Sequence, residues 1–207
     1  MSDQPKFDAI DDGPLALSGN VTFTNSDGSV ADPQETRYLC RCGQSANKPY
    51  CDGTHKDTGF SSDNPVGGHR DKLIAYESED ITVHYSPYLC SHAGECNKRL
   101  SAVFDAKKKP WIQPEHGSVD DIMDVVKACP SGAIQASFKG GAPEHRAGDT
   151  PSVVVEKNGP LRVEAVTLNG GNFSDNASPE KYVLCRCGQS KNKPFCDGSH
   201  SAAGWKE

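Results

Sequence analysis

Hydrophobic residues occur along this chain in short stretches that are separated by polar and glycine-rich segments. Residues 81–86 alternate between apolar and polar side chains, and residues 72–76 are also typical of a strand. Between residues 118 and 129, apolar side chains recur at helical spacing behind Ser118, a favoured N-cap residue, and this predicts a helix. Residues 139–151 have the composition of a linker. No apolar run approaches the roughly 18 residues of a membrane-spanning helix.

One unit of the chain occurs twice, at residues 12–60 and 158–205. Each copy begins with Gly-Pro and a short β-like stretch, then enters a loop rich in cysteine. The two loops are CRCGQSANKPYCDGTH (residues 40–55) and CRCGQSKNKPFCDGSH (residues 185–200), which differ at only three positions. A unit of this size is too small to bury a core alone, so we expect the copies to pack as a pseudo-two-fold pair.

The composition narrows the class of protein. The 207 residues carry a formal net charge of −6, which disfavours a nucleic-acid partner. Only 35% of the residues are hydrophobic, so small cores that need support from a metal are expected. The first residues resemble neither a secretory signal nor a transit peptide. We therefore expect a soluble, cytoplasmic protein with no membrane partner, in which the nine cysteines serve as metal ligands rather than disulfides.

Each repeated loop carries three cysteines and one histidine at spacings that suit a metal centre. Two cysteines lie two residues apart, and the third lies four residues before the histidine, on one face of a helical turn. Either tetrahedral zinc or a [2Fe–2S] cluster accepts such a set. The candidate ligands are Cys40, Cys42, Cys51 and His55 in the first copy, and Cys185, Cys187, Cys196 and His200 in the second.

The full pattern C-x-C-x₂-S-x₃-P-x-C-D-G-(S/T)-H resembles the CDGSH iron–sulfur domain family, the mitoNEET-like proteins, and both copies match it at every motif position. The resemblance implies one [2Fe–2S] cluster per motif, held by three cysteines and one histidine. It also implies that the copies form an intramolecular pseudo-dimer, so that the chain is a monomer. The histidine ligands should raise the reduction potential above that of all-cysteine clusters and make the clusters sensitive to acid. This chain departs from the family in the long insertion between its copies.

The insertion contains a third set of cysteines, Cys90, Cys96 and Cys129, the last of which precedes a proline. In this chain Ala93 stands at the second cysteine position of the bacterial ferredoxin pattern, which resembles single-cluster ferredoxins that lack that ligand. Together with the stretches KKPWIQP and CPSGAI, the set also resembles a divergent mono-cluster ferredoxin family. Three thiolates can hold a [3Fe–4S] cluster, which we favour, or a [4Fe–4S] cluster if another group binds the fourth iron. His92 is the protein candidate for that group, although a structural role for it is favoured. Three ordinary buried thiols are the remaining alternative.

Together these observations predict an α+β protein made of small β-rich repeats and a ferredoxin-like α+β insert. The expected parts are a flexible tail (1–11), the first repeat (12–60), the mono-cluster domain with its linkers (61–150) and the second repeat (151–207). We expect a soluble multi-cluster electron carrier rather than an enzyme, whose partner is a redox protein or an apo-protein that accepts clusters. The alternatives are a cluster donor or redox or pH sensor, and a zinc-stabilised interaction module.

Overall fold

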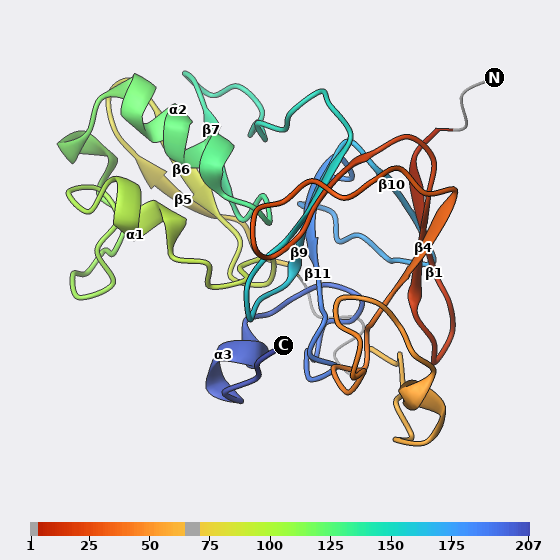
Figure 1. Cartoon of the computed structure of the whole chain (residues 1–207). Coiled ribbons are helices and arrows are strands. Elements are labelled where there is room, and N and C mark those ends of the chain that lie inside the picture. Colours follow the sequence, from red (N-terminus) through yellow and green to blue (C-terminus); the bar gives the residue numbers. More distant parts are fainter. Residues whose placement is uncertain (1–3, 65–70) are drawn as a thin grey trace.

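A computed structural model describes residues 4–64 and 71–207 and contains three small sheets (Figure 1). The first sheet has the order β10 (Thr167–Asn169), β1 (Lys6–Ala9), β2 (Leu15–Ser18), β4 (Thr36–Leu39). The second has the order β11 (Lys181–Leu184), β9 (Leu161–Glu164), β8 (Ser152–Val155), β3 (Thr22–Thr24). The third, in the insert, has the order β5 (Ile74–Glu77), β6 (Thr82–Tyr85), β7 (Ile134–Ser137). The helices are α1 (Glu95–Arg99), α2 (Val119–Ala128), α3 (Ser199–Ala202) and the 3₁₀ turns η1 (Thr54–Lys56) and η2 (Pro114–His116).

The two repeats exchange strands. The first sheet takes β1, β2 and β4 from the N-terminal part of the chain and β10 from the second repeat, while the second sheet takes β3 in return. Both exchanged strands pair in parallel, with Phe7 opposite Leu168 and Phe23 opposite Val153. Neither sheet is therefore complete without a strand from the other repeat.

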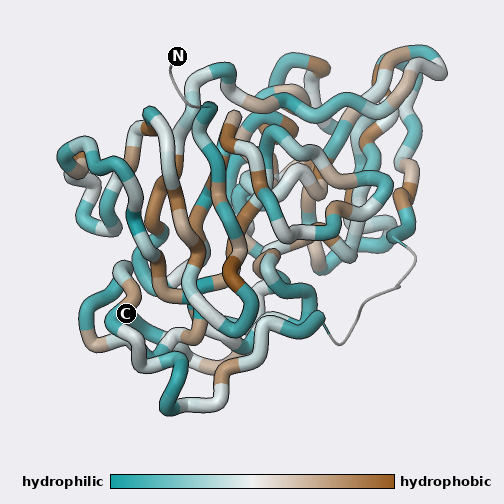
Figure 2. The backbone as a smooth tube through the Cα atoms, turned by 90° about the vertical axis from the view of Figure 1, so that its right-hand side faces the viewer, coloured by the Kyte–Doolittle hydropathy of each residue, from teal (hydrophilic) through white to brown (hydrophobic). Residues whose placement is uncertain are grey.

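The repeats also share one hydrophobic core, as expected for units too small to fold alone. Along the strands hydrophobic positions alternate with hydrophilic ones (Figure 2), so one face of each sheet is apolar. The buried side chains come from both repeats: Phe7, Leu15, Leu17, Phe23, Leu39, Val153, Val155, Leu161, Val163, Val166, Leu168, Tyr182 and Leu184.

The N-terminal segment differs from the prediction of a flexible tail over residues 1–11. Lys6–Ala9 form β1, which pairs with β2 on one side and β10 on the other, and Phe7 is 0% exposed. The strand of the second repeat that corresponds to β1 is β8. The repeat signal in the sequence begins only at residue 12 because KFDA in β1 and SVVV in β8 share no residues. Residues 1–3 of the predicted tail lie outside the described residues.

The insert builds its own core from β5–β7 and α2. The predicted helix is confirmed, and the Ser118 hydroxyl accepts a hydrogen bond from the Asp121 N–H at 3.1 Å as its N-cap. Ile122, Val125 and Val126 face inward and are buried. The strand predicted at 81–86 is confirmed as β6, and the one predicted at 72–76 begins two residues later as β5.

The predicted linker at 139–151 contains no helix or strand. Residues 65–70, in the linker that precedes the insert, lie outside the described residues. Within the described ranges, no helix is long and apolar enough to cross a membrane.

Candidate metal centres

In the first repeat, the loop that follows β4 brings the four candidate ligands together as two pairs. The Sγ atoms of Cys40 and Cys42 are 3.7 Å apart, and the Cys51 Sγ lies 3.3 Å from the His55 Nδ1. A backbone hydrogen bond from the Cys40 N–H to the Pro49 carbonyl, at 2.8 Å, stabilises the loop. The pairs arise from the short spacings within the motif, as the sequence predicts.

Polar residues of the motif shape the loop locally. The Asp52 carboxylate accepts hydrogen bonds from the Thr54 N–H at 3.0 Å and the Ala46 N–H at 2.7 Å, so it orders the turn that carries His55. Hydrogen bonding to Thr54 holds the pKa of Asp52 well below its usual range. The Ser45 hydroxyl donates to the Tyr50 carbonyl at 2.7 Å, which makes it a local turn residue.

The second repeat reproduces this geometry in a more enclosed setting. Its Cys185 and Cys187 Sγ atoms are 3.6 Å apart, and the Cys196 Sγ is 3.5 Å from the His200 Nδ1. The hydrogen bond between these two thiols lowers the pKa of Cys185 and raises that of Cys187. Cys196 is buried, whereas its counterpart Cys51 is half-buried. The first site is therefore the more accessible of the two.

The paired arrangement bears on which metal centre fits. Among residues 4–64 and 71–207, no group of three or more His, Cys, Asp or Glu side chains is placed to hold a single ion. The two close pairs of donors in each repeat suit a [2Fe–2S] cluster, in which each iron takes two protein ligands.

Two arginines within the motifs are buried. Arg41 is 4% exposed and donates from Nε to the Gly13 carbonyl, and Arg186 is 2% exposed and donates from Nε to the Gly159 carbonyl. Each guanidinium also lies over an aromatic ring, Phe60 or Trp205 respectively. Their positive charges are thus fixed in the interior.

These arginine charges act across the two repeats. Burial lowers the pKa of Arg41, and the Cys185 thiol of the other repeat opposes that shift. The pKa of Arg186 is likewise lowered by burial. Its ion pair with Glu207, at 3.0 Å, opposes that shift most, and Cys40 opposes it to a smaller extent. Each arginine therefore lies near a candidate ligand of the opposite repeat and can offset negative charge there.

The two loops approach each other at a pair of glycines. A Cβ atom at Gly43 would lie 2.5 Å from the Cys187 carbonyl oxygen, and one at Gly188 would lie 2.5 Å from that of Cys42. Both glycines have positive φ angles, of 77° and 75°. Only glycine allows this contact, which brings the two metal centres next to each other.

In the insert, the three remaining cysteines border one small cavity. Ala93 and His92 border it too, together with Tyr85 and Trp111. Burial raises the pKa values of the two thiols contributed by the 90–96 loop, and the third thiol adds to both shifts, so the three lie close together. The structure thus places Cys90, Cys96 and Cys129 around a common space.

A buried lysine that the sequence analysis did not identify reaches the insert from the second repeat. Lys181 on β11 is 1% exposed, and its ammonium donates to the carbonyls of Val126 at 2.9 Å and Lys127 at 3.1 Å, near the end of α2. A third carbonyl, that of Arg146, also accepts from it. The only signal in the sequence is a lysine in an otherwise apolar strand, KYVL.

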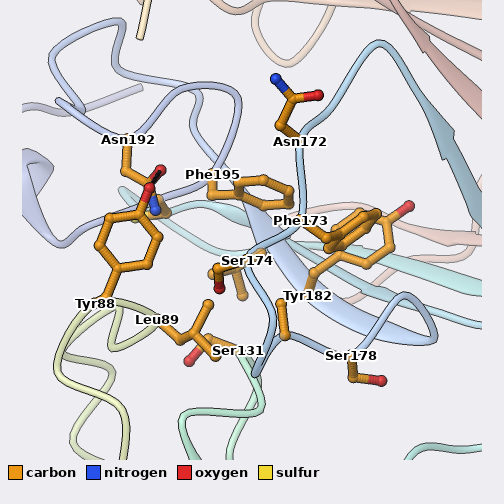
Figure 3. A pocket seen from close by; sticks show the side chains of 13 residues that line it. Tyr88, Leu89, Ser131, Asn172, Phe173, Ser174, Ser178, Tyr182, Asn192 and Phe195 are labelled. Atoms are coloured by element: carbon orange, nitrogen blue, oxygen red, sulfur yellow. Dashed lines mark hydrogen bonds between the residues drawn. The ribbon is translucent and has the colours of Figure 1, made fainter. Parts of the chain in front are cut away.

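The insert and the second repeat enclose a second pocket, which reaches Cys196 (Figure 3). Aromatic rings of Phe173, Tyr182 and Phe195 form one wall, and Tyr88 of the insert points toward Asn192. The Tyr88 hydroxyl donates to the Asn192 Oδ1 at 2.8 Å. This pocket marks the joint between the two units.

Comparison with known proteins gives two families. Residues 12–56 and 158–201 match the family described as iron-binding zinc finger CDGSH type, and residues 76–139 match the family described as divergent 4Fe-4S mono-cluster.

Two curated relatives are similar to parts of the chain. The uncharacterized protein YjdI of Escherichia coli K12 is 36% identical over 73 residues, which are 35% of this chain and 91% of YjdI. The mitochondrial CDGSH iron-sulfur domain-containing protein 3 of Mus musculus is 40% identical over 52 residues, 25% of this chain and 30% of the mouse protein. No solved structure matches the chain.

Proposed function

We propose that this chain, an iron–sulfur protein that belongs to the CDGSH-type iron-binding family and to the divergent 4Fe–4S mono-cluster family, carries electrons through three clusters. The observation that supports this function is the arrangement of eleven candidate ligands as four close pairs and one triplet. Such an arrangement suits three separate clusters, and it uses all nine cysteines of the chain. We propose a carrier rather than an enzyme.

Each repeat would hold one [2Fe–2S] cluster through its two pairs of ligands. A bound cluster of this type supplies one-electron chemistry. The chain contributes a histidine in place of a fourth thiolate, which leaves less negative charge at the site. Buried Arg41 offsets more of that charge, whereas Arg186 is already paired with Glu207, so the histidine ligand is the main reason that both sites should be easier to reduce than an all-cysteine site.

The insert would hold the third cluster through Cys90, Cys96 and Cys129. Because Ala93 borders the same cavity and provides no ligand atom, a [3Fe–4S] cluster fits the donor set better than a [4Fe–4S] cluster. The His92 ring packs against the second repeat, which agrees with a structural role for this residue.

The two repeats would act as an intramolecular pseudo-dimer, with the whole chain a monomer. Strand exchange and the shared core support this proposal, since each sheet already contains a strand from both repeats. A separate partner chain is not needed to complete either sheet.

A second candidate function, donation of a cluster to an apo-protein, is favoured by one observation at the first repeat. Cys51 is half-buried and Asp52 beside it is exposed, whereas Cys196 is buried and Asp197 is half-buried. A cluster at this site would be more open to ligand exchange than one at the enclosed second site.

The test is anaerobic purification followed by iron and sulfide analysis and EPR in both redox states. The proposal predicts about seven irons and about eight sulfides per chain, from two [2Fe–2S] clusters and one [3Fe–4S] cluster. Zinc without sulfide would contradict it and favour an interaction module. Transfer of a cluster to an apo-acceptor faster than electron exchange with a redox partner would favour the donor function.

A further inference from the structure

The insert is attached asymmetrically to the two repeats, and this attachment sets an order among the metal centres. From the contacts below we infer that the middle site exchanges electrons directly with the second-repeat site, and reaches the first-repeat site only through it. The inference rests on the proposed electron-transfer function and deepens it, because it names the internal route.

The middle site touches the second repeat at one of its motif glycines. A Cβ atom at Gly198 would lie 2.8 Å from the His92 Cδ2 and 3.1 Å from the Ser91 carbonyl oxygen. Ser91 and His92 directly follow the ligand Cys90, and Gly198 lies between the ligands Cys196 and His200. The two ligand loops are thus in van der Waals contact.

The matching position in the first repeat lacks such a neighbour. Gly53 has almost the same backbone conformation as Gly198, with φ angles of 93° and 85°. Around Gly53, however, a Cβ atom would meet no heavy atom of the described chain within 4 Å. The repeats are alike in sequence and local geometry, and within the described ranges only the glycine of the second repeat is covered by the insert.

Side-chain contacts fix this attachment. Beyond the Tyr88–Asn192 hydrogen bond, the Ser174 hydroxyl donates to the Asp71 carboxylate at 2.7 Å, and Arg162 on β9 lies 3.4 Å from Glu95 on α1. Buried Lys181 adds its bonds to the end of α2. In Figure 1, β9 and β11 lie between the insert and the sheet that contains β1 and β4.

The second and first sites touch each other in turn. Beside the reciprocal contacts of Gly43 and Gly188, the Trp205 Nε1 donates to the Gly43 carbonyl at 3.1 Å. Contacts between ligand loops therefore run from the middle site to the second repeat and on to the first. In each step one site loses one electron and the next gains it, and no bond or proton needs to change.

Matched deletions of single clusters test the order. Cys40→Ala removes a ligand of the first site and Cys185→Ala removes its counterpart, and each cysteine is 2% exposed. The readout is microwave-power saturation of the EPR signal of the remaining reduced [2Fe–2S] cluster. Cys129→Ala, added to each variant, removes the middle cluster and gives the baseline relaxation.

With Cys40→Ala, the second-site signal should relax several-fold faster when the middle cluster is present than in the baseline. With Cys185→Ala, the first-site signal should relax at nearly the same rate with and without the middle cluster. Equal enhancement in both variants, or a larger one at the first site, would overturn the inference.

Two glycine variants give an independent test that keeps every ligand. Gly198→Ala must push the Ser91–His92 loop away, so it should reduce the relaxation enhancement of the second site. Gly53→Ala imposes the same backbone strain without a clash and should leave the enhancement unchanged. If both substitutions change the relaxation enhancement of the second site, or if neither does, the contact between Gly198 and the Ser91–His92 loop is not the electron route.

The two proposals fail in different ways. Native protein that lacks iron and sulfide would overturn the proposed function and the inference with it. Native protein with three loaded clusters and no difference between the repeats would overturn the inference alone.

Discussion

Gly43 lies directly against the backbone of Cys187, so close that a single added carbon at Gly43 would be 2.5 Å from the Cys187 carbonyl oxygen. The two residues belong to different repeats, and each adjoins or is a candidate metal ligand. A substitution that displaces one ligand loop must therefore displace the other as well.

Gly43→Ala should destabilise both repeat sites. A residue other than glycine at this positive φ angle costs about 1–2 kcal/mol, and the clash with Cys187 adds about 1–3 kcal/mol. Gly53→Ala is the control, because it has the strain without the clash. Denaturant unfolding and the rate of bleaching of the visible absorbance measure the difference. Equal stability of the two variants would show that the loops are not in contact.

Lys181→Met should loosen the insert and lower the reduction potential of the middle site. The substitution removes charged hydrogen bonds worth about 1–3 kcal/mol and a buried positive charge that favours the reduced, more negative cluster. Thr36→Met changes the equivalent position of the first repeat and should leave that potential unchanged. Potentiometric titration monitored by EPR measures the middle-site potential in both variants. A potential in Lys181→Met equal to that in Thr36→Met would exclude the electrostatic effect.

His145 should make the protein less stable in mild acid. Burial, followed by the nearby Lys181 charge, lowers the pKa of His145. The unfolded chain therefore binds this proton at a higher pH than the folded chain, so stability falls as the pH drops below about 6.5 and through the folded pKa. Urea unfolding at neutral and mildly acidic pH should show a smaller loss for His145→Gln than for the native protein. Parallel losses would contradict this assignment.

His55→Cys and His200→Cys should each lower the potential of one [2Fe–2S] site. A fourth thiolate adds one negative charge to the site, which disfavours reduction. Because each histidine Nδ1 lies within 3.5 Å of a cysteine Sγ, a thiolate at that position can take its place with a small shift. Redox titration should show one altered and one native potential in each variant. Two native potentials in both variants would exclude histidine ligation.

Ala93→Cys should convert the middle site from [3Fe–4S] to [4Fe–4S]. Oxidised [3Fe–4S] is paramagnetic and oxidised [2Fe–2S] is EPR-silent, so the oxidised native protein should give one signal that the variant loses. His92→Ala should keep that signal, since His92 packs on Gly198 of the second repeat. An EPR-silent native protein that loses its middle cluster on His92→Ala would instead make His92 the fourth ligand.

Several elements could be read from the sequence because they depend on residues close together in the chain. The pairing of Cys40 with Cys42 and of Cys51 with His55 follows from spacings of two and four residues within one loop. The helix α2 follows from its N-cap and its apolar periodicity in the same way. The ligand pairs depend on local geometry that the second repeat copies almost unchanged, and α2, in the insert, depends only on residues within its own segment.

Only the tertiary structure decided how the repeats and the insert meet. Residues 6–9 form β1 instead of part of the tail expected at residues 1–11, because β1 pairs with β10 of the second repeat. Its Phe7 is buried in a core supplied largely by that repeat. Lys181 bonds to carbonyls 54 and 55 positions away, and Gly198 differs from Gly53 solely in what has folded against it. Nearly identical motifs thus acquire different surroundings, since long-range packing depends on the whole chain and cannot be read from the local spacing of the motif.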